Sequence, residues 1–301
     1  MSRGKILVIR GGAIGDFILT LPALAALRKT FPQTRLEVLG YPHIASLASL
    51  AGYTADVKSI EAGPLAGFFA RRGTLNEALA EYFAGFNIII SYLYDPDGVF
   101  QENIARCSKA QFIAGPHRPS ERDAIHATEV FLKPLERLAI FDADPVPRIP
   151  VPHQTAGGTL AVHPGSGGEK KNWGEERWTE LLTRVANDTN CPVLMIGGEA
   201  EQERVQRLSS LIPIQRLTVV MHQPLPEVAR RLASCRAFLG HDSGITHLAA
   251  AVGLPGVALW AESNESVWRP RSERFELVCA GAKLRDLPSK EVFAAVQRMM
   301  G

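Results

Sequence analysis

The chain has little of what marks a disulfide-rich, membrane-spanning or nucleic-acid-binding protein. It contains only four widely spaced cysteines among 301 residues, so we expect reduced thiols in or near the core. The formal net charge is only +2 and is evenly spread, which disfavours a nucleic-acid partner. No apolar run approaches the roughly 18 residues that span a bilayer. These absences predict a cytoplasmic protein that is soluble or bound peripherally at a membrane.

Strand-like and helix-like segments instead alternate from end to end. Short apolar runs such as 5–10, 88–92 and 237–239 predict buried strands, and the amphipathic stretches between them predict helices. With 46% hydrophobic residues, a chain of this length can form a core in each of two domains. The alternation predicts an α/β fold in which helices cover parallel sheets.

A proline-rich segment divides this pattern. Residues 144–152 carry four prolines, which helices cannot continue through, so we predict an interdomain linker at about 144–155. The predicted domains are 1–152 and 156–301, two doubly wound, Rossmann-like domains that face each other across a cleft. A long amphipathic helix is predicted at 123–141. The closing helix at 289–300 belongs to the second domain, with packing against the first as an alternative.

Two glycine-marked turns, one in each half, carry the strongest functional signal. The first, at 10–16, follows a predicted strand and ends at Asp16. The second, at 240–247, follows the predicted strand 237–239. Glycine lets backbone N–H groups approach a ligand, and the N-terminus of the following helix carries partial positive charge. Each half therefore predicts an anion-binding turn, and the first adds a carboxylate at its rim.

The first turn does not match a dinucleotide-binding fingerprint. A Gly-x-Gly-x-x-Gly motif that begins at Gly11 has Ala13 at its second glycine, and one that begins earlier has Arg10 at its first. The acidic ribose ligand expected after the second strand is also replaced, by Gly40. A dehydrogenase is therefore disfavoured.

Hydrolytic and metal-dependent chemistry are disfavoured as well. The sequence at 240–244 is not Gly-x-Ser-x-Gly, and Asp242 and His247 are too close in sequence to flank Ser243 as a triad. The eight histidines are scattered, with no His-Glu-x-x-His or other metal-ligand spacing. We expect neither a bound metal nor a cofactor.

Two segments of the second half follow predicted strands, where open α/β sheets bind ligands. Residues 163–173 offer glycines, the Ser166 hydroxyl and lysines, which suit a diphosphate, although a flexible surface loop has the same composition. At 197–201, Glu199 or Glu201 suits the hydroxyls of a ribose, although an acid at a helix start also complements the helix dipole.

The turn at 240–247 is the third such segment. Backbone N–H groups of Ser243 and Gly244 are expected to bind phosphate at the helix start, and His247 lies in the first helical turn. Asp242 either contacts the ligand or caps the helix.

Three stretches together resemble the heptosyltransferase-like glycosyltransferases of family 9. They are residues 6–22, residues 163–178 with Lys171-Asn172-Trp173, and residues 242–255 with Asp-Ser-Gly-Ile-Thr-His. The resemblance implies a GT-B fold, with the acceptor on the first domain and a nucleotide-sugar donor on the second. It further implies inverting, metal-independent transfer, usually from ADP-heptose to the inner core of lipopolysaccharide at the inner membrane surface.

The resemblance also implies roles for individual residues. Asp16 corresponds to the general base that takes the proton of the acceptor hydroxyl. Lys171 corresponds to a lysine that contacts phosphate and stabilises the departing diphosphate. Asp242 corresponds to an acid that contacts the donor sugar, and Glu201, or Glu199 in another register, holds the ribose. The remaining donor-binding positions are Ser166, Gly167, Ser243, Gly244 and His247.

The acceptor site is less defined by sequence. Gly12, in the first turn, is assigned to the acceptor side. Basic residues of the first half are candidates for binding the phosphates of a glycolipid or glycan, although a solvated face is the ordinary alternative. They are Arg71, Arg72, Arg118 and Arg122, with Lys109 nearby in sequence.

Some positions depart from the family pattern. The family's Phe-Gly-Pro-Thr-like turn after the strand 256–260 is replaced by Ala-Glu-Ser-Asn at 261–264, and Gly174 stands where proline is often found. These departures leave the identity of the donor sugar and base open. A nucleotide-sugar epimerase and a non-catalytic nucleotide-sugar-binding protein remain as alternative functions.

Overall fold

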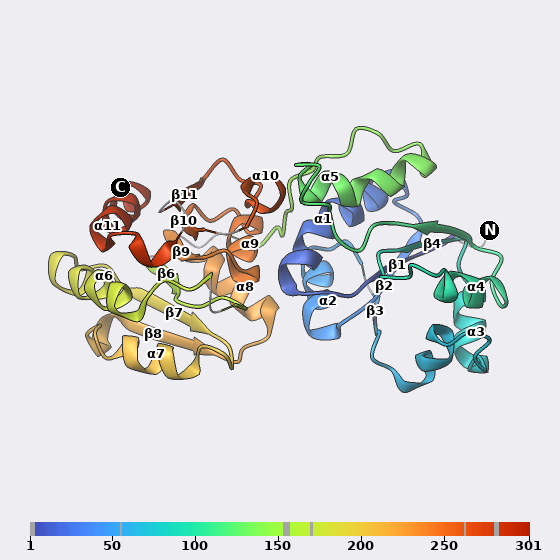
Figure 1. The fold of residues 1–301 in the computed structure, drawn as a ribbon, viewed down its shortest axis with the longest axis horizontal. Coiled ribbons are helices and arrows are strands. Elements are labelled where there is room, and N and C mark those ends of the chain that lie inside the picture. Colours follow the sequence, from blue (N-terminus) through green and yellow to red (C-terminus); the bar gives the residue numbers. More distant parts are fainter. Residues whose placement is uncertain (1–3, 55, 153–156, 169–170, 262, 280–282) are drawn as a thin grey trace. The chain divides into compact units, whose positions relative to one another are not determined.

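The structure is a computed structural model that describes residues 4–54, 56–152, 157–168, 171–261, 263–279 and 283–301. The chain divides into two compact units, Met1–Pro147 and Arg148–Gly301, each with its own parallel sheet (Figure 1). The boundary falls within the proline-rich segment. The predicted α/β class with parallel sheets covered by helices is confirmed.

The sheet of the first unit has the strand order β3-β2-β1-β4-β5, and its pairings are parallel. Isoleucine, leucine and valine dominate the central strands, because helices cover both faces of a parallel sheet. The strands are β1 (Lys5–Arg10), β2 (Arg35–Gly40), β3 (Asp56–Ser59), β4 (Ile88–Ser91) and β5 (Gln111–Ala114).

Helices follow these strands along the chain. They are α1 (Ile14–Thr30), α2 (Pro42–Leu50), α3 (Glu77–Ala84), α4 (Val99–Ala105) and α5 (Ala127–Leu132), with 3-10 helices at Gly63–Phe69 and Lys133–Leu138. Helix α1 packs against α2 and α5, and most of its residues are buried. Phe68, Phe83 and Phe100 pack with residues of β1 and β4 in one apolar cluster.

The sheet of the second unit has the order β11-β10-β9-β6-β7-β8, again parallel. Its strands are β6 (Leu160–His163), β7 (Val193–Gly197), β8 (Leu217–Met221), β9 (Ala237–His241), β10 (Gly256–Trp260) and β11 (Phe275–Cys279). Its helices are α6 (Glu175–Asp188), α7 (Gln202–Ser209), α8 (Leu225–Ala233), α9 (Gly244–Ala251), α10 (Glu265–Trp268) and α11 (Ser289–Met300), with 3-10 helices at Ile214–Arg216 and Leu284–Asp286.

Of two predicted helices, one is wrong and the other is confirmed. The long helix predicted at 123–141 is wrong: α5 ends at Leu132 and a 3-10 turn follows, because Pro134 removes a helical hydrogen bond and its ring crowds the preceding turn. The closing helix α11 has the predicted bounds and lies within the second unit, where it packs against α6, β9, β10 and β11.

The strand order of both sheets indicates where each unit is expected to bind a ligand. In each sheet the strand order reverses beside the first strand, between β1 and β4 and between β6 and β9. Open α/β sheets bind ligands outside the carboxyl ends of the strands at such a reversal. Ligands are therefore expected at the loops that follow these four strands.

Candidate active site

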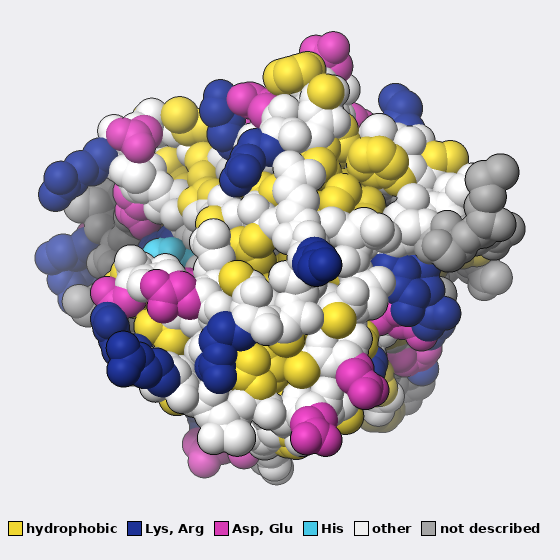
Figure 2. All heavy atoms as spheres, turned by 90° about the vertical axis from the view of Figure 1, so that its right-hand side faces the viewer, with side chains coloured by type: hydrophobic (Ala, Val, Ile, Leu, Met, Phe, Trp, Pro, Cys, Tyr) yellow, Lys and Arg dark blue, Asp and Glu magenta, His cyan; other side chains and the backbone are white. Residues whose placement is uncertain are grey.

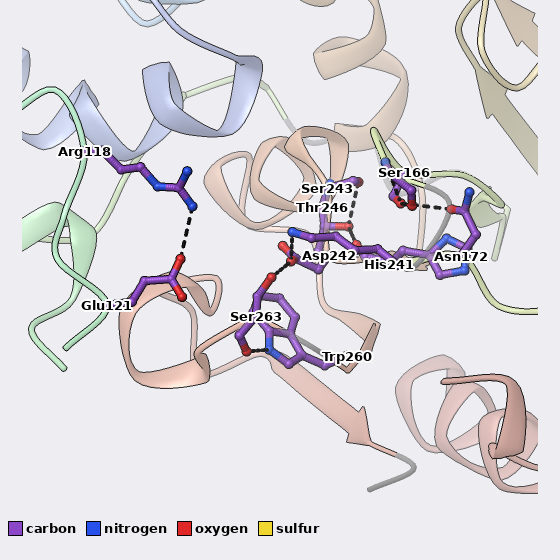
Figure 3. Close-up of polar contacts among 12 residues, drawn as sticks. Arg118, Glu121, Ser166, Asn172, His241, Asp242, Ser243, Thr246, Trp260 and Ser263 are labelled. Atoms are coloured by element: carbon purple, nitrogen blue, oxygen red, sulfur yellow. Dashed lines mark hydrogen bonds and ion pairs between the residues drawn. The ribbon is translucent and has the colours of Figure 1, made fainter. Parts of the chain in front are cut away.

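In the second unit, the loops after β6 and β9 are held together by His241, which is labelled in Figure 3. This side chain is fully buried, and its Nε2 accepts a hydrogen bond of 2.8 Å from the backbone N–H of Trp173. Because that nitrogen accepts, the hydrogen belongs on Nδ1, which lies 3.2 Å from the carbonyl oxygen of Gly165 and donates to it. The Trp178 ring packs edge-on against the imidazole. A neutral His241 thus fixes both ends of the 165–173 loop on β9.

Lys171 and Asp242, predicted from separate motifs, form an ion pair at this edge of the sheet. The Lys171 Nζ lies 2.5 Å from Asp242 Oδ2, and the Ser263 hydroxyl donates a hydrogen bond to the same oxygen. The Asp242 side chain is only 11% exposed, whereas that of Lys171 is 39% exposed. The Trp260 indole N–H donates to the Ser263 carbonyl over 2.8 Å and fixes that residue (Figure 3). The lysine ammonium therefore has a fixed counter-ion and still reaches solvent.

The alternative that Asp242 caps the following helix is wrong. Ser243 is the N-cap of α9, and its Oγ accepts from the backbone N–H of Thr246. Thr246 in turn donates its hydroxyl to the His241 carbonyl. The first N–H groups of any helix have no carbonyl partner within it, so the α9 N-terminus at Gly244 offers donors beside the Lys171–Asp242 pair. His247 is buried in the first turn, which fits support of the turn.

In the loop after β6, the predicted diphosphate-binding hydroxyl makes its contacts within the loop itself. Ser166 is buried, and its Oγ lies 2.9 Å from both the Gly168 carbonyl and Asn172 Oδ1, so this hydroxyl is engaged within the loop (Figure 3). At Gly167 an added Cβ would meet no atom within 4 Å. Glu169 and Lys170 lie outside the described residues.

Of the two candidate ribose ligands, Glu201 is the one built into the site. Its Oε2 accepts a hydrogen bond of 2.9 Å from the Gly198 N–H. Its side chain also lies against Gly165, where an added Cβ would come 2.1 Å from Glu201 Cγ. Glu199 is exposed. The structure therefore brings Glu201, rather than Glu199, to the loop after β6.

In the first unit, Asp16 lies in the first turn of α1. Its Oδ2 accepts from the backbone N–H of Ala13 over 3.1 Å, and its side chain is 29% exposed. Gly12 has φ +96°, and an added Cβ would lie 3.0 Å from Asp16 Oδ2. Glycine at position 12 therefore serves the turn conformation and leaves room for the carboxylate.

The Arg10 side chain stabilises this turn, a role that the sequence did not predict. Its guanidinium donates to the backbone carbonyl of His117 over 2.8 Å and to that of Asp16 over 3.3 Å, and it lies 3.8 Å from Asp16 Oδ1. It also lies 4.4 Å from the centre of the Phe131 ring. The side chain is 2% exposed, and this burial lowers the pKa of Arg10 from its ordinary value.

The predicted acceptor-binding arginines lie in two segments. Arg71 and Arg72 follow the 3-10 helix Gly63–Phe69, whereas Arg118 and Arg122 lie in the loop after β5. Arg71 is paired with Asp97 at 3.1 Å, and Arg118 with Glu121 at 3.0 Å. On the face shown in Figure 2, basic side chains lie apart, with acidic and hydrophobic ones between them. Exposed pairs of this kind contribute little to stability and remain accessible to a charged ligand.

The described residues contain neither a cluster of metal-ligating side chains nor a membrane-spanning helix. No group of three or more histidine, cysteine, aspartate or glutamate side chains in the described part of the chain is placed to hold a metal ion. Among the same residues, no helix is both long and apolar enough to cross a membrane. The cysteines differ from expectation at one position, since Cys279 is exposed.

Relatives of the chain have names that agree with one another. A protein of Haemophilus influenzae named "Putative glycosyltransferase" is 25% identical over 298 residues, which span 88% of this chain and 86% of that protein. Lipopolysaccharide heptosyltransferase 1 of Pseudomonas aeruginosa is 32% identical over 131 residues, 43% of this chain and 33% of that protein. Residues 146–294 match the family model of glycosyltransferase family 9 (heptosyltransferase).

The chain is a glycosyltransferase of the heptosyltransferase-like kind, and residues 146–294 carry its match to family 9. Its fold is shared with solved heptosyltransferases. The E. coli heptosyltransferase WaaC with ADP has a TM-score of 0.76 at 17% identity, covering 98% of this chain and 99% of that chain. The same enzyme with ADP-2-deoxy-2-fluoro heptose has a TM-score of 0.73 at 18% identity, with the same coverage. The predicted GT-B-like pair of parallel-sheet domains is confirmed, and the chain is a glycosyltransferase.

In this glycosyltransferase, His241 and Ser263 are the residues of the second unit's candidate site that the sequence did not predict. His241 is a lone polar side chain that ends a buried apolar strand, a signal that was available. Ser263 lies in the turn that departs from the family pattern, and nothing local links it to Asp242, 21 residues earlier.

The buried histidines of this glycosyltransferase make its stability depend on pH. Burial lowers the pKa of His241 to about 3, and burial likewise lowers that of His163. The unfolded chain protonates these groups below its own pKa near 6.5, whereas the folded chain keeps them neutral, so stability is complete above that pH and falls as pH decreases. From pH 7 to pH 5 we expect a loss of about 2 kcal/mol from His241 alone.

Urea unfolding at the two pH values measures this loss. The variant His241→Gln has an amide that does not titrate but can still donate and accept hydrogen bonds. Its loss of stability between pH 7 and pH 5 should be smaller than that of the wild type by about 2 kcal/mol. Equal losses in wild type and variant would show that His241 is protonated equally in the folded and unfolded chains.

Proposed function

We propose that this enzyme transfers a sugar from an ADP-sugar donor, heptose in the first instance, to a lipopolysaccharide-core or related glycan acceptor, with inversion and without a metal ion. The observation that carries the proposal is the convergence of Lys171, Asp242, Glu201 and the α9 N-terminus at one edge of the second sheet. Relatives named lipopolysaccharide heptosyltransferase and the solved WaaC complexes with ADP and an ADP-heptose analogue support the choice of donor.

The donor-side residues have complementary tasks. The α9 N-terminus and the Lys171 ammonium supply the positive charge that a diphosphate needs, and both stabilise the negative charge that grows as the sugar–phosphate bond breaks. Asp242 positions the ammonium and accepts from a hydroxyl of the donor sugar. Glu201, held by the Gly198 N–H, accepts from the ribose hydroxyls. The loop glycine Gly167 leaves space beside the diphosphate.

Asp16 supplies the base. Its Oδ2 is held by the Ala13 N–H, and Arg10 lies near Oδ1, so the carboxylate has a fixed direction and remains partly exposed. It accepts the proton of the acceptor hydroxyl while that oxygen attacks the anomeric carbon and the diphosphate leaves. Arg71, Arg72, Arg118 and Arg122 are proposed to bind acceptor phosphates, which would bring the enzyme to the inner membrane surface.

Titration calorimetry of the whole chain against ADP, UDP and GDP in the presence of a chelator tests the donor proposal. We expect ADP to bind at least about tenfold more tightly than UDP or GDP, a difference of about 1.4 kcal/mol. Transfer from ADP-heptose to a core oligosaccharide, followed by mass spectrometry, then tests the reaction. Preference for UDP or GDP would replace the donor, and turnover of donor without acceptor would indicate an epimerase instead.

A further inference from the structure

The first unit has a pocket of about 230 Å³ at the carboxyl ends of β4 and β5. Its lining includes Ser91, Leu93, Tyr94, Gln101, Phe112 and His117. This pocket is smaller than the roughly 300–1,000 Å³ of pockets for drug-sized ligands, so its size suits one ring. None of these residues belongs to the motifs that indicated the donor site or the base.

Two aromatic rings meet at the rim of this pocket. The centroids of Tyr94 and His117 are 4.6 Å apart, in an edge-on arrangement. Tyr94 is 70% exposed, although it is one of the largest apolar side chains of the unit. The face of an aromatic ring carries negative partial charge, which attracts the weakly positive C–H groups on the face of a sugar ring. The rim therefore presents an exposed surface suited to a pyranose.

Polar groups are placed around these rings. The carboxylate of Asp95 accepts from the backbone N–H groups of Phe100, at 3.1 Å, and Gln101, at 3.0 Å, and so fixes the start of α4. Gln101 and His117 are both among the residues that line the pocket. Both side chains can donate and accept hydrogen bonds, as sugar hydroxyls require.

The pocket is connected to the proposed base through Arg10. One guanidinium nitrogen donates to the His117 carbonyl, and the other donates to the Asp16 carbonyl. The two loops also lie close together, since an added Cβ at Gly11 would lie 3.8 Å from Leu93 Cδ2. Strands β1 and β4 are neighbours in the sheet, so their carboxyl ends lie at the same edge. A ligand ring in the pocket is therefore beside the turn that carries Asp16.

We propose that this pocket is a saccharide subsite of the acceptor, in which a pyranose ring lies on Tyr94 and His117 and presents its hydroxyl toward Asp16. The subsite rests on the proposed glycosyl transfer for its role in the reaction. It differs from the arginine-based acceptor site, because stacking and neutral hydrogen bonds select the sugar ring, whereas arginines select phosphate.

Steady-state transfer to a core oligosaccharide tests this subsite with Tyr94→Ala. We expect the acceptor KM to rise about 3- to 10-fold, the effect of losing one aromatic contact, while kcat and the Kd for ADP stay within about twofold of wild type. Tyr94→Phe keeps the ring and should restore the KM. Phe141→Ala removes an aromatic side chain of similar exposure, 69%, elsewhere in the same unit and should change nothing. An unchanged KM in Tyr94→Ala would overturn the assignment.

Direct binding separates this proposal from the proposed function. Saturation-transfer NMR with methyl glucoside, galactoside and mannoside pyranosides should show contacts to ring protons that weaken in Tyr94→Ala and persist in Phe141→Ala. Such contacts without any sugar transfer would support the subsite and reject the transferase. Transfer with no pyranoside contact, or contacts to adenosine that depend on Tyr94 in their place, would reject the subsite and retain the transferase.

Discussion

Replacing Asp16 with asparagine should reduce the transfer rate by about 10²- to 10⁴-fold, the range that a general base contributes. The substitution keeps the size of the side chain, and its carbonyl oxygen still accepts from the Ala13 N–H that holds Oδ2 now. What it removes is the capacity to take a proton. Asp16 belongs to the first unit, whereas the donor residues belong to the second. The Kd for ADP should therefore remain within about twofold of wild type.

The decisive readout is the contrast between rate and affinity. Single-turnover transfer with saturating donor measures the first, and calorimetry with ADP measures the second. Glu81→Gln, which neutralises an exposed acid on α3 in the same unit, is the matched control and should leave both unchanged. A variant Asp16→Asn that loses donor affinity would make Asp16 a binding residue, and one that keeps the wild-type rate would place the base elsewhere.

The fold could be predicted from the sequence because its strands are short buried runs. Segments such as 5–10 and 256–260 have no polar face, so few structures other than a helix-covered parallel strand accommodate them. The long predicted helix at 123–141 was wrong because its apolar periodicity continues through Pro134, and the ring, rather than the pattern, decides where the helix ends.

Candidate site residues could be predicted where the turn itself carries them. Asp16 and Asp242 each lie at a turn after a buried strand, the position that a parallel sheet gives to ligand-binding groups. The partners of these residues were not predictable, because they come from distant segments. Arg10 donates a hydrogen bond to the carbonyl of His117, which is 107 residues away. His241 Nε2 accepts one from the backbone N–H of Trp173, which is 68 residues away. Such contacts depend on strand order, which apolar runs alone do not specify.

The ion pair between Lys171 and Asp242 could likewise not be predicted from either motif. The two residues are 71 positions apart, and each was assigned to the donor separately. Their ion pair connects the two predictions physically: the Asp242 carboxylate fixes the position of the ammonium, and the Lys171 side chain stays partly exposed to solvent. Because the Lys171 side chain remains 39% exposed while its counter-ion is nearly buried, the ammonium keeps a fixed position and can still bind an anion.

Removing the ammonium with Lys171→Met should therefore affect catalysis more than folding. We expect kcat/KM for the donor to fall about 10²- to 10³-fold, comparable to the loss of one preorganised group that stabilises developing negative charge. The Kd for ADP should also rise, by at least about tenfold, because ADP is the departing diphosphate itself and carries the charge that the ammonium stabilises. The temperature of thermal unfolding should fall, because the nearly buried Asp242 carboxylate loses its counter-ion, but the variant should stay folded because the Ser263 hydroxyl still donates to that carboxylate. Lys290→Met, at an exposed lysine on α11, is the matched control.

A double-mutant cycle with Asp242→Asn decides whether the two side chains act as a unit. If Asp242 works mainly by positioning the ammonium, its substitution should have little further effect once Lys171 is methionine, and the losses in kcat/KM will be far from additive. If Asp242 contacts the donor sugar independently, the two losses will multiply. Wild-type kcat/KM in Lys171→Met would reject the lysine as the stabiliser of the leaving diphosphate and leave that task to the N–H groups at the start of α9.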